Sequence, residues 1–454
     1  MLSSEIDTLE KLQARLQTAE LTSVDLVEAS LSRIQNPEGQ GSIVFTRIFA
    51  DAARREAQAS DRRRQAGRTL SLIDGLPISV KDLFDIEGYP TRAGSVVLSD
   101  AKPALQDALI VKRLREAGAI IIGTTNMTEF AYSGLGLNPH FGTPLSPWRR
   151  LDQHIAGGSS SGAAVSVADG MVAGAIGTDT GGSVRIPAAF CGLVGYKPTA
   201  KLIDMRGTLP LSTHLDSIGP IAHTVSDCAY LAAVMAGEPI KPLTVLPLQG
   251  LRFGIPRQLV LDGMDESVSA RFSVVCSQLE RAGVSMVSLD LPELEEIAPM
   301  NAAGGFTAAE AWAWHRDLLS GRQNEYDPRV SIRIQRGEPL GKDYIDNLEA
   351  QRQNWIGRVR SRLNEFDALV MPTVPVVPPA LAPLEADDDL YARTNLLVLR
   401  NPSVINFLDG CAISLPCHEH NKAPVGLMIA APGGQDERLL GIAKSCEALI
   451  SAMR

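Results

Sequence analysis

The sequence has few cysteines and no long apolar run. Six cysteines are scattered over 454 residues without CxxC spacing, namely Cys191, Cys228, Cys276, Cys411, Cys417 and Cys446. This distribution argues against a disulfide scaffold and a structural zinc site. No apolar run reaches the ~18 residues that a membrane helix needs, and the chain start lacks the basic and apolar segments of a signal peptide. We therefore expect free buried thiols, no membrane association and a cytoplasmic protein.

Basic charge and histidine are also scarce. The formal net charge is −9 at pH 7, which argues against a broad nucleic-acid-binding surface. The run Arg62 to Arg64 follows acidic residues, and we expect a solvated helix face there rather than a polyanion site. The seven histidines show no metal-binding spacing, and His418 and His420 are expected at the surface. We therefore predict no metal, no cofactor and no direct nucleic-acid partner.

The apolar pattern predicts an α/β protein. Residues 7–35 show helical periodicity with a second helix capped at Thr22 or Ser23, and a third helix is expected over 49–65. A helix followed by a strand is expected at 107–124 and a strand–helix–strand unit at 251–289, an alternation that favours parallel strands. Residues 207–220 resemble a loop, whereas 308–366 are mostly helical. Further strands are expected at 367–372, 412–415 and 425–429, and a last helix at 437–453.

The stretch from Gly157 to Pro187 contains two glycine–serine turns. The first places Ser159, Ser160 and Ser161 after two glycines, and the second places Ser183 after two more. A phosphate cradle is disfavoured because the GxxxxGK[ST] pattern is absent and no lysine follows either turn. One such turn would be read as structural packing. Two turns in one stretch favour a nucleophile with an oxyanion hole.

The second turn offers amides for an oxyanion hole but no base. Consecutive amides at Thr180, Gly181, Gly182 and Ser183 can form an anion-binding nest. The GxSxG elbow is not matched, because Arg185 lies two residues after Ser183. Lys81 closes an apolar strand, where it is either half of a structural salt bridge or a base whose pKa is lowered by burial. Ser159 can relay the proton between Ser183 and Lys81.

These motifs resemble the amidase signature family of serine hydrolases. The resemblance rests on GLPISVKD around Lys81, GGSSSG from Gly157, and GTDTGGSVRIPAAFCGLVGYKPT from Gly177. It extends to NMTEF at 126–130, SIGP at 217–220, YDP at 326–328, FD at 366–367 with PTVP at 372–375, and PVG at 424–426. It covers nearly the whole chain. Two departures are Ser161, where many members have glycine, and Ser146 in place of a common asparagine.

The resemblance assigns roles by position. Ser183 looks like the acylated nucleophile, Ser159 like the cis-peptide serine and Lys81 like the base, with Thr180 to Ser183 as oxyanion-hole amides. Ser160 and Asp179 match supporting positions, and Arg185 matches an arginine that is more structural than substrate-binding. The implied fold is a single α/β/α domain with a mixed, mostly parallel central sheet flanked by helices. We expect residues 67–454 to form it, and residues 1–66 to be a helical segment that packs on the core or forms an interface.

The resemblance implies hydrolysis of a small amide, urea or biuret-like compound. The alternative subgroup is the A subunit of a glutamyl-tRNA amidotransferase, a glutaminase that works in a multi-subunit complex. The sequence KDLFDIEG after Val80 and the residues after Lys197 differ from the usual pattern of that subgroup. We therefore favour a stand-alone amidase, expected as a homodimer and possibly with a small accessory subunit. The proline-rich residues 372–383 are expected to form an extended loop over one end of the sheet, or else a plain surface connection.

Overall fold

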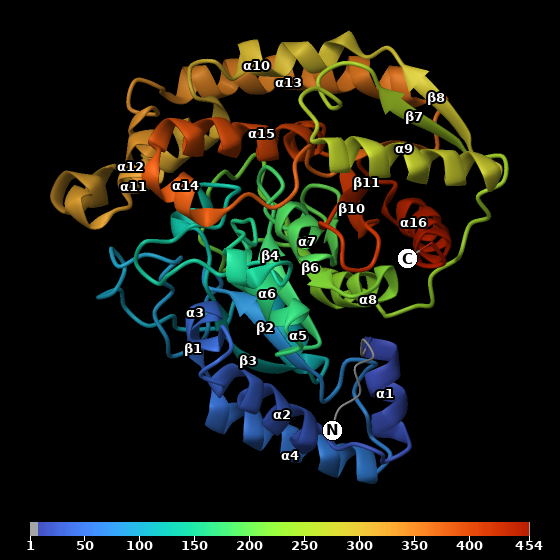
Figure 1. The fold of residues 1–454 in the computed structure, drawn as a ribbon. Helices are drawn as coiled ribbons and strands as arrows, with labels where there is room; N and C mark the ends of the chain where they lie inside the picture. Colours follow the sequence, from blue (N-terminus) through green and yellow to red (C-terminus); the bar gives the residue numbers. More distant parts are fainter. Residues whose placement is uncertain (1–7, 454) are drawn as a thin grey trace.

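The computed structural model describes residues 8–453 as one sheet flanked by helices (Figure 1). The strands are β1 (Phe45–Ile48), β2 (Pro77–Lys81), β3 (Ile120–Thr125), β4 (Gly174–Thr178), β5 (Val194–Lys197), β6 (Ile218–Ala222), β7 (Arg252–Pro256), β8 (Ser285–Leu289), β9 (Ala368–Pro372), β10 (Cys411–Pro416) and β11 (Gly426–Ala431). They form one sheet in the order β1-β3-β2-β4-β6-β5-β10-β11-β9-β7-β8.

Helices make up most of the remaining chain. The α-helices are α1 (Leu9–Gln17), α2 (Ser23–Gln35), α3 (Gly41–Val44), α4 (Ala50–Gln65), α5 (Leu109–Glu116), α6 (Ser161–Ala168), α7 (Arg185–Cys191), α8 (Val225–Ala236), α9 (Glu266–Arg281), α10 (Ile297–Met300), α11 (Gly305–Arg322), α12 (Pro328–Gln335), α13 (Lys342–Leu363), α14 (Leu381–Ala386), α15 (Asp388–Phe407) and α16 (Asp436–Ser451). Four short 3-10 segments are η1 (Glu129–Ala131), η2 (Arg150–Asp152), η3 (Pro292–Glu296) and η4 (Gln323–Glu325).

The sheet is mixed, as predicted, but antiparallel pairs outnumber parallel ones. Within residues 8–453, six strand pairs are antiparallel and four are parallel. The expectation of a mostly parallel sheet is therefore corrected. The parallel pairs β2–β3 and β7–β8 are joined by the crossover helices α5 and α9. The pairs β5–β6 and β10–β11 have no helix between their strands, so the chain can return antiparallel.

Helices bury both faces of the sheet. Along β11, Leu427 and Ile429 join a core cluster with residues of α8, α9 and α16. Met428 and Ala430 alternate with them and join a second cluster with residues of α13 and α15. This alternation is the period-2 pattern of a strand covered on both sides. The layered α/β/α architecture is therefore confirmed.

The N-terminal helices follow the predicted pattern. Thr22 caps α2 in a capping box with Asp25, and α4 covers the expected third helix. Asp7, where the first helix was expected to begin, lies outside the described residues. Helices α1, α2 and α4 lie together at the lower end of Figure 1. The segment also contributes β1, which the sequence did not predict and which pairs with β3.

Several other expectations need correction. Strand β6 begins inside the region expected to be a loop, and α14 occupies part of the proline-rich stretch. Helix α8, which the sequence predicts to start at Ser226 or Asp227, begins at Val225 with Thr224 as its cap. The run Arg62 to Arg64 is not simply solvated, because Arg63 pairs with the buried Asp74. All six cysteines are free and five are buried, as expected.

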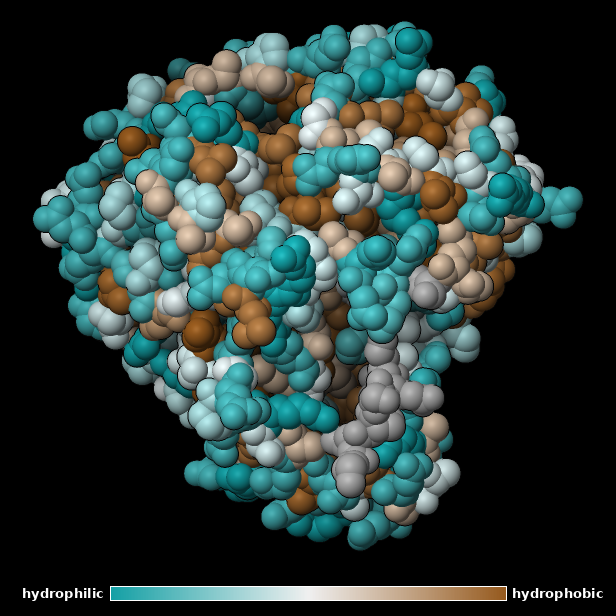
Figure 2. Space-filling view, in the orientation of Figure 1, coloured by the Kyte–Doolittle hydropathy of each residue, from teal (hydrophilic) through white to brown (hydrophobic). Residues whose placement is uncertain are grey.

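The structure contains no bilayer-length apolar helix within the described part of the chain. The face shown in Figure 2 is hollowed between α15 and α13, and hydrophobic side chains gather over α15 there. Helix α15 also contacts the second glycine–serine turn, because the Ser403 hydroxyl donates to the Gly181 carbonyl at 3.3 Å. The hollow therefore adjoins the helix that covers this turn.

Candidate active site

Lys81 ends β2 and points into the protein interior. Every residue of β2 is buried, and the Lys81 side chain is fully buried. Its ammonium donates to the Ser159 hydroxyl at 2.7 Å and to the Thr178 hydroxyl at 2.9 Å. Burial lowers the pKa of Lys81 to about 7, although Asp216 and Asp179 act in the opposite direction. A neutral amine is therefore accessible near physiological pH.

Ser159 is held by the first glycine turn. The peptide bond between Gly158 and Ser159 is cis. The Gly158 amide donates to the Gly134 carbonyl at 2.8 Å, and the Ser159 carbonyl accepts from the Thr128 amide at 3.1 Å. A Cβ on Gly158 would lie 2.6 Å from backbone atoms of Gly136, so only glycine fits there. The turn is thus fixed on both sides of Ser159.

The second turn places Ser183 immediately before α7. Ser183 is 3% exposed, and its carbonyl accepts from the Ser160 amide at 3.3 Å, which joins the two turns. Within residues 8–453, its hydroxyl forms no hydrogen bond with Ser159 or Lys81. The structure therefore brings Lys81 and Ser159 into direct contact. Ser183 is joined to this pair only through the backbone of Ser160, the residue after Ser159.

The predicted oxyanion amides are not equivalent. The Gly182 amide donates to Asp179 at 2.8 Å. The amides of Thr180, Gly181 and Ser183 have no acceptor in the described chain. Gly182 also has a φ of +120°, a conformation that favours glycine. The turn consequently offers three amides rather than four.

Asp179 and Arg185 form a fully buried ion pair. The Arg185 guanidinium donates to both carboxylate oxygens, at 3.0 and 2.8 Å, and also to Asn406 at 2.7 Å. Burial alone would raise the pKa of Asp179, but Arg185 outweighs it and holds that pKa well below its ordinary value. Asp179 also accepts from the Gly182 and Val184 amides. The ion pair therefore shapes the second glycine–serine turn. This agrees with a structural role for Arg185 rather than a substrate-binding one.

The remaining predicted positions pack around the turns. The Ser160 hydroxyl donates to the Thr178 carbonyl at 3.4 Å. Ser161 begins α6, and its hydroxyl has no partner within residues 8–453. Ser146 donates to the Phe190 carbonyl at 2.8 Å and so anchors α7. The two departures from the family pattern thus lie close to the turns without contacting Lys81.

Sequence reasoning missed three buried polar residues near the site. Thr178 contacts Lys81 because β4 runs parallel to β2. Lys197 donates to the carbonyls of Pro198 and Gly410, and burial lowers the pKa of Lys197 to about 8. Asp216 was recognised only as a loop residue. Thr178 and Lys197 each end a buried strand, and a charged or hydroxyl residue at such a position is the same signal that identified Lys81.

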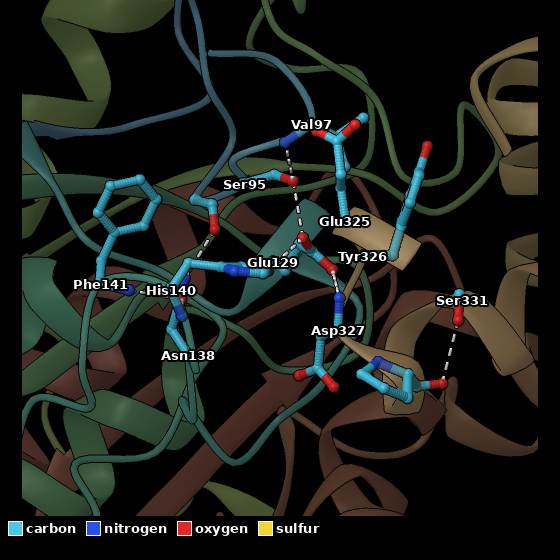
Figure 3. A network of polar contacts seen from close by, with 12 residues as sticks. Ser95, Val97, Glu129, Asn138, His140, Phe141, Glu325, Tyr326, Asp327 and Ser331 are labelled. Carbon is cyan, nitrogen blue, oxygen red and sulfur yellow. Dashed lines mark hydrogen bonds and ion pairs between the residues drawn. The ribbon is translucent and has the colours of Figure 1, made fainter. Parts of the chain in front are cut away.

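A buried polar network centred on Glu129 holds the loops around the site (Figure 3). The fully buried Glu129 carboxylate accepts from the Ser95 hydroxyl at 2.7 Å, the Asp327 amide at 2.8 Å and the His140 ring at 2.9 Å. The hydrogen bond with Glu129 raises the pKa of His140. Because Thr128 binds the Ser159 carbonyl, this network also fixes the loop that supports the relay serine.

The proline-rich stretch covers α7. Val374 shares a core cluster with Ile186 and Phe190, and Val376 and Leu381 pack against that cluster. Strand-like contacts tie the stretch to the loop before the first turn, because the Ile155 amide donates to the Pro379 carbonyl at 2.9 Å. The stretch is therefore packed against the helix that follows Ser183 and is more than a surface connection.

Comparison with known proteins agrees with this geometry. A family model described as Amidase matches residues 25–440. The chain is 35% identical over 443 residues to a 2-amino-5-chloromuconic acid deaminase from Comamonas testosteroni, covering 96% of this chain and 95% of the relative. It is 32% identical to the A subunit of the glutamyl-tRNA(Gln) amidotransferase from Chloroflexus aggregans, covering 96% and 94%.

Solved structures show the same architecture. A crystal structure of an amidase superposes with a TM-score of 0.86 at 30% identity, covering 97% of this chain and 99% of that one. The peptide amidase of Stenotrophomonas maltophilia gives a TM-score of 0.80 at 26% identity, covering 98% and 97%. The resemblance inferred from the motifs is thereby confirmed.

Proposed function

The chain belongs to the amidase family, and we propose that it hydrolyses the C–N bond of a small amide, urea or biuret-like compound through an acyl-enzyme on Ser183. As a family member it is an amidohydrolase that acts on C–N bonds. The single observation that carries the proposal is the buried contact between Lys81 and Ser159, at 2.7 Å, beside the turn that holds Ser183. A buried lysine that is neutral near pH 7 is suited to act as a base.

The proposed reaction begins with neutral Lys81. As the Ser183 hydroxyl attacks the carbonyl carbon, its proton passes to Ser159, and the Ser159 proton passes to Lys81. The amides of Thr180, Gly181 and Ser183 stabilise the developing oxyanion. The relay then reverses, and the leaving amine takes the proton as the C–N bond breaks. Water attacks the acyl-enzyme by the same relay and releases the acid.

A fluorophosphonate probe tests the nucleophile. We expect mass spectrometry to find the label on Ser183, and Ser183→Ala to abolish both labelling and turnover. Ser361→Ala removes an exposed serine on α13 and serves as the matched control, which should label as the wild type does. Full activity of Ser183→Ala, or a label on another residue, would refute the assignment.

The substrate can be sought among small amides and amino-substituted acids. The relative from Comamonas testosteroni is named for 2-amino-5-chloromuconic acid, so unsaturated amino acids of this kind belong in the panel with amides, ureas and biuret-like compounds. Ammonia or amine release measured for each compound would identify the leaving group. Trapping the acyl-enzyme on Ser183 would give the mass of the acyl group.

A second candidate is the A subunit of an amidotransferase. Relatives with that name are 32% identical over nearly the whole chain. Purification with and without co-expressed neighbouring gene products separates the two candidates. Glutaminase activity that appears only in a complex favours the second, whereas turnover of small amides by the isolated chain favours the first.

The cytoplasmic location, the homodimer and the small accessory subunit remain predictions. The mass of the purified assembly tests the homodimer and the accessory subunit.

A further inference from the structure

Asp216 lies two residues before β6, in the loop that returns from β5. It is 9% exposed. One carboxylate oxygen accepts the Thr180 hydroxyl at 2.5 Å, and the other accepts the amides of Leu211 and Ser212 at 2.9 and 3.0 Å. The carboxylate therefore joins the loop 211–217 to the nucleophile turn.

Thr180 is the point of contact within that turn. Its hydroxyl is bound by Asp216, while its amide is one of three without an acceptor in residues 8–453. The neighbouring backbone is fixed by a reciprocal pair, because Asp179 and Ser217 exchange hydrogen bonds at 2.8 and 3.1 Å. The side chain of Asp216 thus holds a residue whose amide we have proposed to bind the oxyanion.

The charge of Asp216 is not neutralised nearby. Asp179, the other acid that acts on Lys81, is paired with Arg185. Asp216 has no cation within ion-pair distance in the described chain. It lies near Lys81, because Thr178, which binds Lys81, pairs in the sheet with Ile218, two residues after Asp216, and its negative charge therefore acts on Lys81. Glu310 of α11 acts on Asp216 from the other side and is itself bonded to the His214 ring at 2.9 Å. Burial raises the pKa of Asp216 to about 6, so it is anionic at neutral pH.

We propose that Asp216 is a positioning residue with two separable effects, given the proposed function. Its hydrogen bond fixes Thr180, and with it one oxyanion amide. Its negative charge favours protonation of Lys81 and so sets the pH at which the base becomes available. The first effect requires the Thr180 hydroxyl, whereas the second requires only the charge. Substitutions at the two positions can therefore distinguish them.

The experiment compares Asp216→Asn, Thr180→Val and Thr180→Ser. For each variant, turnover and the rate of fluorophosphonate labelling are measured as functions of pH. Asp216→Asn removes the charge, and we expect the acidic limb of both profiles to move to lower pH by about one unit. Thr180→Val keeps the charge, and we expect kcat to fall roughly tenfold or more while the limb stays in place. Thr180→Ser restores the hydroxyl and should recover most of kcat.

Asp204→Asn is the matched control. Asp204 lies in the same β5–β6 connection but is partly exposed and pairs with Arg206, so neither profile should change. Circular dichroism and thermal unfolding verify that each variant folds. If Asp216→Asn does not fold, the two Thr180 variants still decide the hydrogen-bond effect. Glu310→Gln then decides the charge effect through a small shift of the limb to higher pH, because loss of the Glu310 charge lowers the pKa of Asp216 and makes it more fully anionic.

Two outcomes count against the inference. A limb that stays in place in Asp216→Asn overturns the charge effect, and unchanged kcat in Thr180→Val overturns the positioning effect. Both tests apply only when mass spectrometry has found the fluorophosphonate label of the wild-type protein on Ser183. A wild-type label on a different residue instead refutes the proposed function, so the two failures are distinguishable.

Discussion

Lys81 combines complete burial with a short contact to a serine hydroxyl. A buried ammonium is costly unless it is paired, and Lys81 has only two hydroxyl partners and no ion pair within residues 8–453. The alternative reading of Lys81 as half of a structural salt bridge is thus disfavoured by its surroundings. The cost of burial is what places its pKa in the range that a base needs.

The first prediction concerns pH. Lys81 must be neutral to accept a proton, and its pKa is lowered to about 7. We therefore expect kcat/KM to rise as pH increases through about 7 and to level off above it. Initial rates across the pH range test this, and a rate that stays flat into acid would contradict Lys81 as the base. Lys81→Met should be inactive, whereas Lys422→Met, at an exposed lysine, should keep the wild-type profile.

The second prediction concerns Gly158. Gly158→Ala would push a Cβ against the Gly136 backbone, which cannot move as a flexible side chain can. We expect the first turn to be displaced, with labelling of Ser183 reduced at least tenfold and the free energy of unfolding lowered by about 2 kcal/mol. Gly357 on α13 provides the control, because a Cβ added there would meet nothing within 4 Å. Gly357→Ala should stabilise by about 0.5 kcal/mol or more, since alanine favours the helix.

At the scale of elements, the basic run on α4 shows what sequence alone could not resolve. Arg62 is exposed, whereas Arg63 donates to Asp74, which is fully buried. The Ser60 hydroxyl and the Leu70 amide bind the same carboxylate, each at 2.9 Å. Two adjacent arginines thus have different surroundings, because helical geometry turns them by about 100° relative to each other.

The third prediction follows from this difference. Arg63→Ala removes the cation from a buried carboxylate, and we expect the free energy of unfolding to fall by roughly 3 kcal/mol. Arg62→Ala should change it by less than about 0.5 kcal/mol. Urea denaturation of both variants measures the contrast. Equal effects would show that the Arg63–Asp74 pair contributes nothing specific.

The sequence predicts elements best where local signals are strong. Thr22 was one of two candidate caps because a capping side chain acts on its own helix, and Lys81 was placed correctly at the end of β2 because that strand is mostly apolar. Strand β6 was missed because its glycine and proline obscure a strand that is specified by pairing with β4 and β5. The contacts of Thr178 and Asp216 depend on strand order, which no local pattern reveals.

Strand order also decides how the site is assembled across the molecule. Lys81 ends β2, and its neighbour β4 leads into the turn of Ser183. The motifs identify the three chemical groups, but the sheet brings them together. The mostly parallel sheet was expected from the family resemblance and from the alternation of helices and strands, and the strands joined by α5 and by α9 are indeed parallel. The antiparallel centre arises from connections without helices, which the sequence shows less clearly.

The fourth prediction concerns the first 66 residues. The sequence predicts a helical segment that packs on the core or forms an interface, and β1 of this segment pairs with β3, which in turn pairs with β2. Val27 and Leu31 of α2 also share a core cluster with Val165 of α6, the helix that follows the first turn. Removing residues 1–66 would expose this cluster and leave an edge of β3 unpaired. We therefore expect a chain of residues 67–454 to aggregate or to remain unfolded.

A cleavage experiment separates loss of contacts from loss of chain continuity. A protease site inserted at Gly67, where an added Cβ would meet no atom within 4 Å, lets the full chain fold before it is cut. The two fragments should co-elute and unfold in one thermal transition, with Ser183 still labelled, because the interface is part of the core. The chain of residues 67–454 could instead fold alone, with the wild-type melting temperature and labelling rate. In that case the N-terminal segment would be an independent unit, and β1 would contribute nothing to the sheet that carries Lys81.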